Sequence, residues 1–289
     1  MTTRLLDGRA VALELAKKAR EELGWIQAEH CFTPTLFIVR VGSEQSSVAY
    51  ERSIVRTGRK AGISVESIEL PEGSSPDQLR TNLECLNSDP MVHGIIVLQP
   101  LPEQLSRFAV ADIIAPSKDV DGITTYNAGR LFHDDFDVLA PSTPAGGMAL
   151  LKHYQIPISG KRAVVVGRSS VVGKPMAMML LAEDGTVTIC HSKSRDLAHI
   201  CQQADILVSA VGRANFITRE FVGPGATVVD FGVNFIDGEM TGDVDVEDVS
   251  GVAGALTPVP GGTGRVTTMV LVRNTIRAAR QAARAPDEP

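Results

Sequence analysis

The sequence predicts an α/β protein of two domains, each built on a parallel sheet covered by helices. The chain has 289 residues, about twice the ~150 residues of a common single domain. Short apolar segments alternate with helix-forming segments along the chain, a pattern that is typical of parallel sheets with helices on their faces. Residues 139–147, rich in proline and glycine, are expected to link the two domains.

The first part of the chain is expected to form three strands and four helices. Residues 6–23 carry apolar positions at helical spacing with charges between them, which predicts an amphipathic helix. Ser46 or Ser47 is expected to cap the helix that contains Tyr50. The expected strands are 35–41, 64–70 and 93–98, and the other helices are about 48–61, 77–86 and 108–114.

The second part is expected to form a Rossmann-type series of strands and helices. The expected strands are 163–166, 186–190, 205–211 and 226–233, and the expected helices are 148–154, a helix after Pro175, 196–203 and about 267–283. Residues 260–265 are rich in glycine and are expected to be a loop. The last helix is expected to return to the first domain.

Residues 163–175 contain the most informative local pattern, Ala-Val-Val-Val-Gly-Arg-Ser-Ser-Val-Val-Gly-Lys-Pro. A buried strand leads into Gly167, which allows a tight turn, and Gly173 allows a close backbone approach. Pro175 suits the first turn of a helix. Such a turn favours an anion, because free N–H groups and the helix dipole point at it. An ordinary strand-to-helix turn has a similar pattern.

The end of the next strand indicates which dinucleotide this turn binds. A Rossmann domain that binds NAD places a carboxylate there, whereas the 2′-phosphate of NADP is met by basic or hydroxyl groups. Here the strand is followed by His191, Ser192, Lys193, Ser194 and Arg195, and Arg168 lies on the same side. A solvated polar turn is the alternative. Together with residues 163–175, this set favours NADP.

Composition excludes several classes of function. The net charge of -6 argues against nucleic acid as the main partner. No apolar run reaches the ~18 residues that span a membrane. The four cysteines have no metal-ligand spacing, so we expect reduced thiols, a cytoplasmic location and no metal.

Eleven motifs occur in the order known from one enzyme family. They are Ser47-x-x-Tyr50, Gly94-Ile-Ile-Val, Pro100-Leu-Pro, Lys118-Asp-Val-Asp-Gly122, Tyr126-Asn-x-Gly-Arg-Leu131, Pro141-Ser-Thr-Pro144, residues 167–175, His191-Ser192, Asp230-Phe-Gly-Val-Asn234, Gly242-Asp-Val and Thr257-Pro-Val-Pro-Gly-Gly262. On these motifs the chain resembles the methylenetetrahydrofolate dehydrogenase/methenyltetrahydrofolate cyclohydrolase (FolD) family over nearly its full length.

The resemblance implies a folate site in a cleft between a catalytic domain, residues 1–140 plus 266–289, and an NADP domain, residues 141–265. It implies that Tyr50 stacks near the folate ring and that Asp121 hydrogen-bonds the pterin, with Ser47, Pro260, Gly261 and Arg265 at the same site. The cofactor contacts that it implies are Thr143, Gly167, Arg168, Ser169, Gly173, His191 and Ser192. It also implies a homodimer formed through the NADP domains.

The chain departs from the family pattern at the positions of a catalytic pair. The family has a lysine four residues after the tyrosine, where this chain has Ile54, and a glutamine where this chain has Leu98. Gln99 is one residue further along, and a shift of one residue turns a side chain to the other face of a strand. Arg265 stands where the family has proline, and it either faces the cleft or decorates a loop.

The two reactions of the family depend on this pair to different degrees. Hydride transfer from 5,10-methylenetetrahydrofolate to NADP⁺ depends mainly on the positioning of two bound molecules. Hydrolysis of the methenyl product needs proton transfer, and losing a positioned acid–base group costs about 10²–10⁴-fold in rate. The sequence therefore predicts an NADP-dependent dehydrogenase whose cyclohydrolase activity is weak or lost.

Three alternatives remain open from the sequence. The first is the full bifunctional enzyme, with hydrolysis supported by other residues. The second is an NADP oxidoreductase of this fold that acts on a different pterin or one-carbon carrier. The third is a catalytically silent NADP-binding protein, against which Asp121, Arg168 and Ser192 argue.

Overall fold

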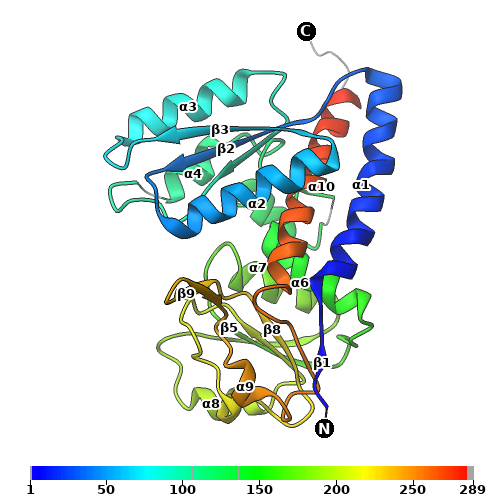
Figure 1. Ribbon diagram of the computed structural model, residues 1–289, viewed down its shortest axis with the longest axis vertical. Coiled ribbons are helices and arrows are strands. Elements are labelled where there is room, and N and C mark those ends of the chain that lie inside the picture. Colours follow the sequence, from blue (N-terminus) through cyan, green and yellow to red (C-terminus); the bar gives the residue numbers. More distant parts are fainter. Residues whose placement is uncertain (1, 106, 136, 285–289) are drawn as a thin grey trace. The chain divides into compact units, whose positions relative to one another are not determined.

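The computed structural model describes residues 2–105, 107–135 and 137–284, with the backbone alone at 107–109. The chain divides into two compact units, which are described separately (Figure 1). Unit 1 contains the residues up to Leu13 and residues 143–267, and unit 2 contains residues 14–142 and the chain from Thr268 onward. The boundaries fall within α1 (Gly8–His30), the first turn of α6 (Ser142–His153) and α10 (Thr263–Arg284).

Unit 2 is organised around a parallel sheet with the strand order β3-β2-β4. Its strands are β2 (Thr35–Val41), β3 (Ser64–Leu70) and β4 (Gly94–Val97). Val39 and Val41 of β2 belong to a buried cluster with Leu83 of α3 (Pro76–Ser88), whereas Arg40 pairs with Glu51 of α2 (Gln45–Ala61). Since side chains alternate along a strand, α2 and α3 cover opposite faces of this sheet (Figure 1).

The other described helices of unit 2 are α4 (Arg107–Ile113) and α5 (Thr125–Phe132). The prediction that Ser46 or Ser47 caps α2 is wrong. The cap is Glu44, whose carboxylate accepts a hydrogen bond from the Ser47 amide at 3.0 Å. The Ser47 hydroxyl instead donates to the carbonyl of Gln99 at 2.9 Å, so it joins α2 to the segment after β4.

Unit 1 contains a six-stranded parallel sheet with the order β1-β11-β8-β7-β5-β6. Its strands are β1 (Arg4–Leu5), β5 (Arg162–Val166), β6 (Thr186–Cys190), β7 (Ile206–Ser209), β8 (Thr227–Asp230) and β11 (Ala255–Leu256). The other elements are α7 (Gly173–Ala182), α8 (Leu197–Gln202), the 3-10 turn Arg219–Phe221, α9 (Val246–Val249) and a hairpin of β9 (Asn234–Ile236) with β10 (Glu239–Thr241).

The position of β5 within this sheet matters for ligand binding. β5 lies between β6 and β7, so the chain moves outward from β5 in opposite directions. Open α/β sheets bind ligands outside the carboxyl ends of strands at such a switch point. The Rossmann-type arrangement predicted for the second part of the chain is confirmed, and the turn after β5 occupies the expected place.

Two segments expected to be loops are partly helical. The expected linker at 139–147 is helix from Ser142, and the expected loop at 260–265 is helix from Thr263. The glycines of the first segment serve packing, because a Cβ atom on Gly147 would lie 2.4 Å from the Phe231 ring. Among the described helices, none has the length and apolar character needed to cross a membrane.

Candidate functional site

Tyr50, Asp121 and Ser142 form a polar cluster in unit 2. Ser142 is fully buried, and its hydroxyl donates a hydrogen bond to the Asp121 carboxylate. Burial and the neighbouring Asp121 charge raise the pKa of Tyr50 well above its usual range, and a hydrogen bond with Ser142 offsets this only in part. Tyr50 therefore remains a neutral phenol near pH 7, which provides a hydrogen-bond donor and an aromatic face beside a carboxylate.

The backbone that carries Asp121 is held by its neighbours in the motif 118–122. Asp119 is fully buried and accepts hydrogen bonds from the amides of Ile123 at 3.0 Å and Thr124 at 2.8 Å. Lys118 donates to three carbonyls around the end of α3, those of Leu86, Asn87 and Asp89. These two side chains are engaged with the backbone, so Asp121 is the residue of this motif that belongs to the polar cluster.

Asp121 and Ser142 are 21 residues apart, and two features bring their backbones together. Gly122 has a φ of +64°, and a Cβ atom there would lie 2.5 Å from the backbone nitrogen of Pro141. Asn274 of α10 donates to the carbonyl of Val120 at 2.8 Å and to that of Ala140 at 2.9 Å. Asn274 is 8% exposed, so it is a buried side chain that links the segment before Asp121 to the segment before Ser142.

Ile54 and Leu98, the substituted positions of the family pair, are both enclosed in unit 2. Ile54 is 0% and Leu98 is 2% exposed. Ile54 lies four residues after Tyr50 in α2, so the two side chains project from neighbouring positions of the helix. Gln99 is exposed, and its carbonyl is the acceptor for Ser47. Neither Ile54 nor Leu98 has a group that can bind or release a proton.

In unit 1, the pairing of β5 with β6 brings the predicted cofactor residues to one edge. Val166 is opposite Cys190, and the amide of Gly167 donates to the carbonyl of Cys190 at 2.9 Å. Arg168 and Ser192 each follow that pair by two residues, and both are exposed. The register of two parallel strands therefore places a guanidinium-bearing residue and a hydroxyl-bearing residue at the carboxyl ends of adjacent strands.

The turn between β5 and α7 has the tight geometry that a phosphate-binding turn needs. Gly167 has a φ of +136°, and a Cβ atom there would lie 2.4 Å from the carbonyl oxygen of Ala210. A Cβ atom on Gly173 would lie 2.2 Å from the Gly167 oxygen. The Ser169 hydroxyl accepts from the amides of Val172 at 3.1 Å and Gly173 at 3.3 Å. Larger residues at either glycine would close this turn.

The donor set at the end of β6 fits a dinucleotide with an additional phosphate. Residues 191–195 contain a histidine, two serines, a lysine and an arginine, and no carboxylate. The hydroxyl of Ser194 accepts from the His191 amide at 2.9 Å, and the His191 ring accepts from the Lys193 amide at 3.1 Å. These bonds shape a compact turn beside Ser192 whose side chains suit an anion rather than a ribose diol.

The remaining residues predicted for the site also lie in unit 1. Thr143 is the second residue of α6, directly after Ser142. Pro260 and Gly261 precede α10, and Gly261 accepts a hydrogen bond from the amide of Gly8 at 2.9 Å. Arg265 is exposed in the first turn of α10. The arginine is thus part of a helix, although its segment was expected to be a loop.

Two buried aspartates support the loops that follow β7 and β8. Asp243 accepts hydrogen bonds from the amides of Val211 at 2.7 Å, Gly212 at 3.1 Å and Arg213 at 2.9 Å. Asp230 accepts from the amide of Asp243 at 3.1 Å. Burial raises the pKa of Asp230 to about 6. The motifs 230–234 and 242–244 therefore provide a buried scaffold for the carboxyl end of the sheet.

Sequence reasoning did not assign roles to Ser142, Asn274 or Asp243. Ser142 lies in the motif 141–144, which was a signal for it, whereas nothing near Asn274 in the sequence points to residues 120 and 140. Within the described residues, no group of His, Cys, Asp or Glu side chains has the arrangement of a metal site. All four cysteines are free, and two of them, Cys190 and Cys201, are buried.

Together these features place the chain among α/β proteins of two units, with a dinucleotide-type site on one sheet and a half-buried polar cluster beside the other. Residues 6–121 match the family model described as the tetrahydrofolate dehydrogenase/cyclohydrolase catalytic domain. Residues 141–283 match the NAD(P)-binding domain of the same family. The chain belongs to the tetrahydrofolate dehydrogenase/cyclohydrolase family.

Individual relatives agree along the full chain. The bifunctional protein FolD of Herpetosiphon aurantiacus is 47% identical over 284 residues, which cover 98% of this chain and 99% of that protein. The bifunctional FolD of Campylobacter jejuni superposes with a TM-score of 0.92 at 36% identity, covering 96% of this chain and 99% of the other. The FolD of Trypanosoma brucei, solved with NADP cofactor and an inhibitor, has a TM-score of 0.93 at 32% identity, covering 99% and 100%.

Proposed function

We propose that this protein is an NADP-dependent 5,10-methylenetetrahydrofolate dehydrogenase with weak or no methenyltetrahydrofolate cyclohydrolase activity. Its membership of the family and the fit of residues 167–173 and 191–195 to a phosphorylated dinucleotide support the first part. The second part rests on one observation. The positions of the family's lysine and glutamine are Ile54 and Leu98, which are aliphatic and almost completely buried.

For the cofactor, we propose contacts from the turn after β5 and the turn after β6. Bound NADP⁺ supplies an acceptor for the hydride of the one-carbon bridge. Arg168 and Ser192 would hold the 2′-phosphate, and the remaining contacts would come from Thr143, Gly167, Ser169, Gly173 and His191. Arginine suits this role because its planar guanidinium binds phosphate in a bidentate manner.

For the folate, we propose contacts from Ser47, Tyr50 and Asp121 in unit 2. The family resemblance also implies folate contacts from Pro260, Gly261 and Arg265, which belong to unit 1. Tyr50 provides an aromatic face, and Asp121 accepts hydrogen bonds from the pterin. The hydrogen bond from Ser142 fixes the orientation of this carboxylate. Positioning of this kind supports a hydride transfer, since that step needs orientation rather than a protein base.

Hydrolysis of the methenyl product makes a different demand on the same residues. Water must attack the bridging carbon and lose a proton, and a positioned acid–base group contributes about 10²–10⁴-fold to such a step. Tyr50 is held neutral, and Ile54 and Leu98 offer no proton. We therefore expect the dehydrogenase product to leave the enzyme as the methenyl compound.

Paired assays test the proposal. Wild-type protein is expected to reduce NADP⁺ when given methylenetetrahydrofolate. It is not expected to accelerate the loss of the methenyl absorbance above the spontaneous rate. The variant Ile54→Lys/Leu98→Gln is expected to accelerate that loss by about 10²-fold or more, because it restores a proton-transferring pair. Rapid methenyl hydrolysis by the wild type would overturn the proposal that this activity is weak.

A matched variant separates the chemistry from disturbed packing. Ile54→Met/Leu98→Met keeps both positions apolar at similar volume, which cores usually tolerate. It is expected to reduce NADP⁺ and to remain inactive in hydrolysis. Circular dichroism and thermal unfolding show whether the variant with a lysine at the buried position 54 is folded.

We also propose that the protein is a cytoplasmic homodimer. Sedimentation equilibrium would test the oligomeric state, and cell fractionation would test the location.

A further inference from the structure

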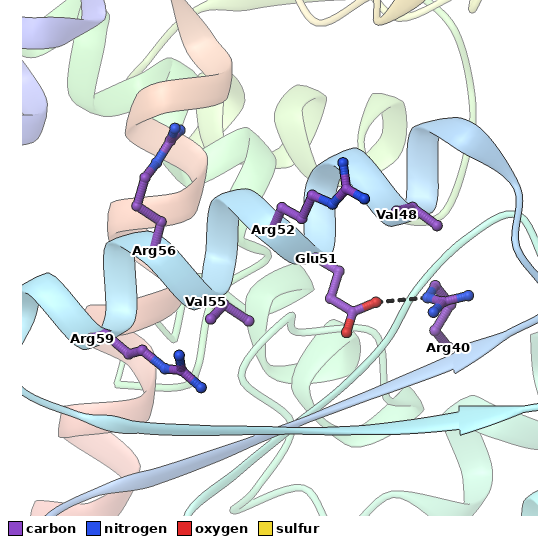
Figure 2. Close-up of a pocket in the computed structure, with 7 residues that line it drawn as sticks. All are labelled: Arg40, Val48, Glu51, Arg52, Val55, Arg56 and Arg59. Carbon is purple, nitrogen blue, oxygen red and sulfur yellow. Dashed lines mark hydrogen bonds and ion pairs between the residues drawn. The ribbon is translucent and has the colours of Figure 1, made fainter.

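A groove outside the proposed folate and NADP sites runs along the outer side of α2 (Figure 2). It has a volume of about 470 Å³, which lies in the range of small-molecule sites, ~300–1,000 Å³. Its lining residues are four arginines, two valines and one glutamate: Arg40, Arg52, Arg56, Arg59, Val48, Val55 and Glu51. The groove is therefore strongly basic, although the chain as a whole has a net charge of -6.

The charge of Arg40 is already paired with carboxylates of the protein. Arg40 is 8% exposed, and its guanidinium lies 2.6 Å from Glu51 and 2.9 Å from Glu69. Burial opposes ionisation of Glu51, but hydrogen bonds from Ser67 and Arg40 outweigh it and lower the pKa of this carboxyl. The charges of Arg40 and Glu51 therefore neutralise each other within the groove. Figure 2 draws the contact between these two side chains.

The other three arginines are exposed and project from α2 (Figure 2). Among the described residues, Arg52, Arg56 and Arg59 form no ion pair and no side-chain hydrogen bond, although the charge of Arg52 helps to lower the pKa of the neighbouring Glu51. They follow one another at spacings of four and three residues, so they share one side of the helix. Like charges at such spacings destabilise a helix, so the chain keeps an unfavourable arrangement along a groove.

The spacing and the valines indicate the class of ligand. Seven residues of helix rise about 10 Å, so a single small anion cannot meet all three guanidinium groups, whereas a chain of anionic groups can. Val48 and Val55 are also seven residues apart, are half-buried and line the same groove. They offer an apolar wall to methylene segments between the charges.

We propose that this groove binds an oligocarboxylate, a flexible chain of carboxylates separated by methylene segments, as in γ-linked oligoglutamate. Each guanidinium can donate two parallel hydrogen bonds to one carboxylate. Such a ligand has two possible sources: a free oligocarboxylate, or a glutamate tail carried by the folate substrate. The second source rests on the proposed function, whereas the first does not.

Isothermal titration calorimetry with free γ-linked pentaglutamate tests the proposal without any catalysis. Wild-type protein is expected to bind one molecule, with an affinity that falls as salt rises, since exposed charges are screened. Arg52→Gln/Arg56→Gln/Arg59→Gln is expected to bind at least about tenfold more weakly. Lys17→Gln/Lys18→Gln/Arg20→Gln, which removes the same charge from α1, is expected to bind like the wild type. Absence of binding to the wild type, or equal losses in both variants, would overturn the proposal.

Two further arms sharpen the assignment. Tripolyphosphate has the charges but no methylene segments, and binding as tight as that of pentaglutamate would overturn the choice of an oligocarboxylate. The KM for methylenetetrahydrofolate with one and with five glutamates identifies the source. A lower KM for the longer substrate that disappears in the triple arginine variant assigns the groove to the substrate's tail. Equal KM values together with calorimetric binding assign it to a free ligand.

Discussion

At the scale of single residues, Leu98 and Gln99 show that an offset of one residue decides whether a side chain is buried or exposed. Leu98 is 2% exposed, whereas the side chain of Gln99 is exposed. Alternation along an extended segment was enough to predict from the sequence that neighbours on the strand face opposite sides. The sequence did not reveal that the Gln99 carbonyl anchors Ser47, because that contact joins residues 52 positions apart.

Asp230 leads to a prediction about pH and stability. Burial, with a contribution from the Asp243 charge, raises its pKa to about 6, above the ~3.9 of an unfolded chain. Its contribution to stability is therefore complete below about pH 4 and is lost as the pH rises through about 6. Asp230→Asn lacks this titration but destabilises the protein, since one oxygen that accepts from an amide becomes a donor.

We expect the difference in the free energy of unfolding between wild type and Asp230→Asn to shrink by about 1–3 kcal/mol between pH 4 and pH 7.5. Urea unfolding at a series of pH values measures this difference, and titrating groups distant from Asp230 cancel in the comparison. A difference that stays constant or grows with pH would contradict the assignment of a raised pKa to Asp230.

At the scale of elements, strands were easier to predict than helix starts. The bounds predicted for β2, β3 and β6 agree with the structure. β2 and β6 are short runs rich in β-branched residues, whereas β3 alternates apolar and polar residues. The starts of α6 and α10 were missed because proline and glycine usually indicate loops. In α6, Gly147 lies against the Phe231 ring, a contact between distant segments that outweighs local propensity.

Helix α10 supports the polar cluster of unit 2 through Asn274. Asn274→Ala removes hydrogen bonds to the carbonyls of Val120 and Ala140 and leaves one buried and one partly buried acceptor without this partner. We expect a loss of about 2–4 kcal/mol in the free energy of unfolding. We also expect kcat/KM for methylenetetrahydrofolate to fall by about tenfold or more, because Asp121 and Ser142 lose their alignment.

Asn87→Ala is the matched control for this prediction. Asn87 also makes two hydrogen bonds between segments of unit 2, to the Ile113 carbonyl at 2.6 Å and from the Ala115 amide at 2.9 Å. The hydrogen bonds of its side chain go to Ile113 and Ala115 rather than to Tyr50, Asp121 or Ser142, and the substitution keeps the Asn87 carbonyl that Lys118 binds. The loss of this side chain is therefore expected to lower stability and to leave kcat/KM unchanged. Equal effects of the two variants on kcat/KM would contradict a positioning role for Asn274.

At the scale of the whole molecule, cofactor binding couples to global stability. A ligand at 100 times its Kd stabilises a folded protein by about 2.7 kcal/mol. If Arg168 and Ser192 hold a 2′-phosphate, NADP⁺ is expected to raise the Tm by several degrees and NAD⁺ at the same concentration by much less. Arg168→Gln is expected to weaken NADP⁺ binding by at least about tenfold, which equals about 1.4 kcal/mol.

Differential scanning fluorimetry across a cofactor titration measures these shifts. Arg162→Gln is the control, since Arg162 is an exposed arginine at the amino end of the same strand, β5. It is expected to keep the wild-type preference for NADP⁺. A wild type that responds equally to NAD⁺ and NADP⁺ would contradict the assignment of residues 168 and 192.

From the order of residues alone we predicted the α/β architecture and the chemical character of the two proposed ligand sites. Short apolar strands, helical periodicity and the glycine turn at 163–175 are local patterns, so they can be recognised without a fold. The same holds for the basic and hydroxyl residues after Cys190, and for the aliphatic residues at 54 and 98. These features follow from the order of residues along the chain.

The contacts between residues that are distant in the sequence became visible only in the folded structure. The Ser142–Asp121 hydrogen bond, the Asn274 bridge and the groove of arginines on α2 each depend on segments brought together by sheet register and helix packing. A hydrogen bond acts over about 3 Å in space whatever the separation in sequence. The motifs in the sequence were therefore enough to predict Tyr50 and Asp121 as site residues, but they could not show which residues hold Asp121 in place.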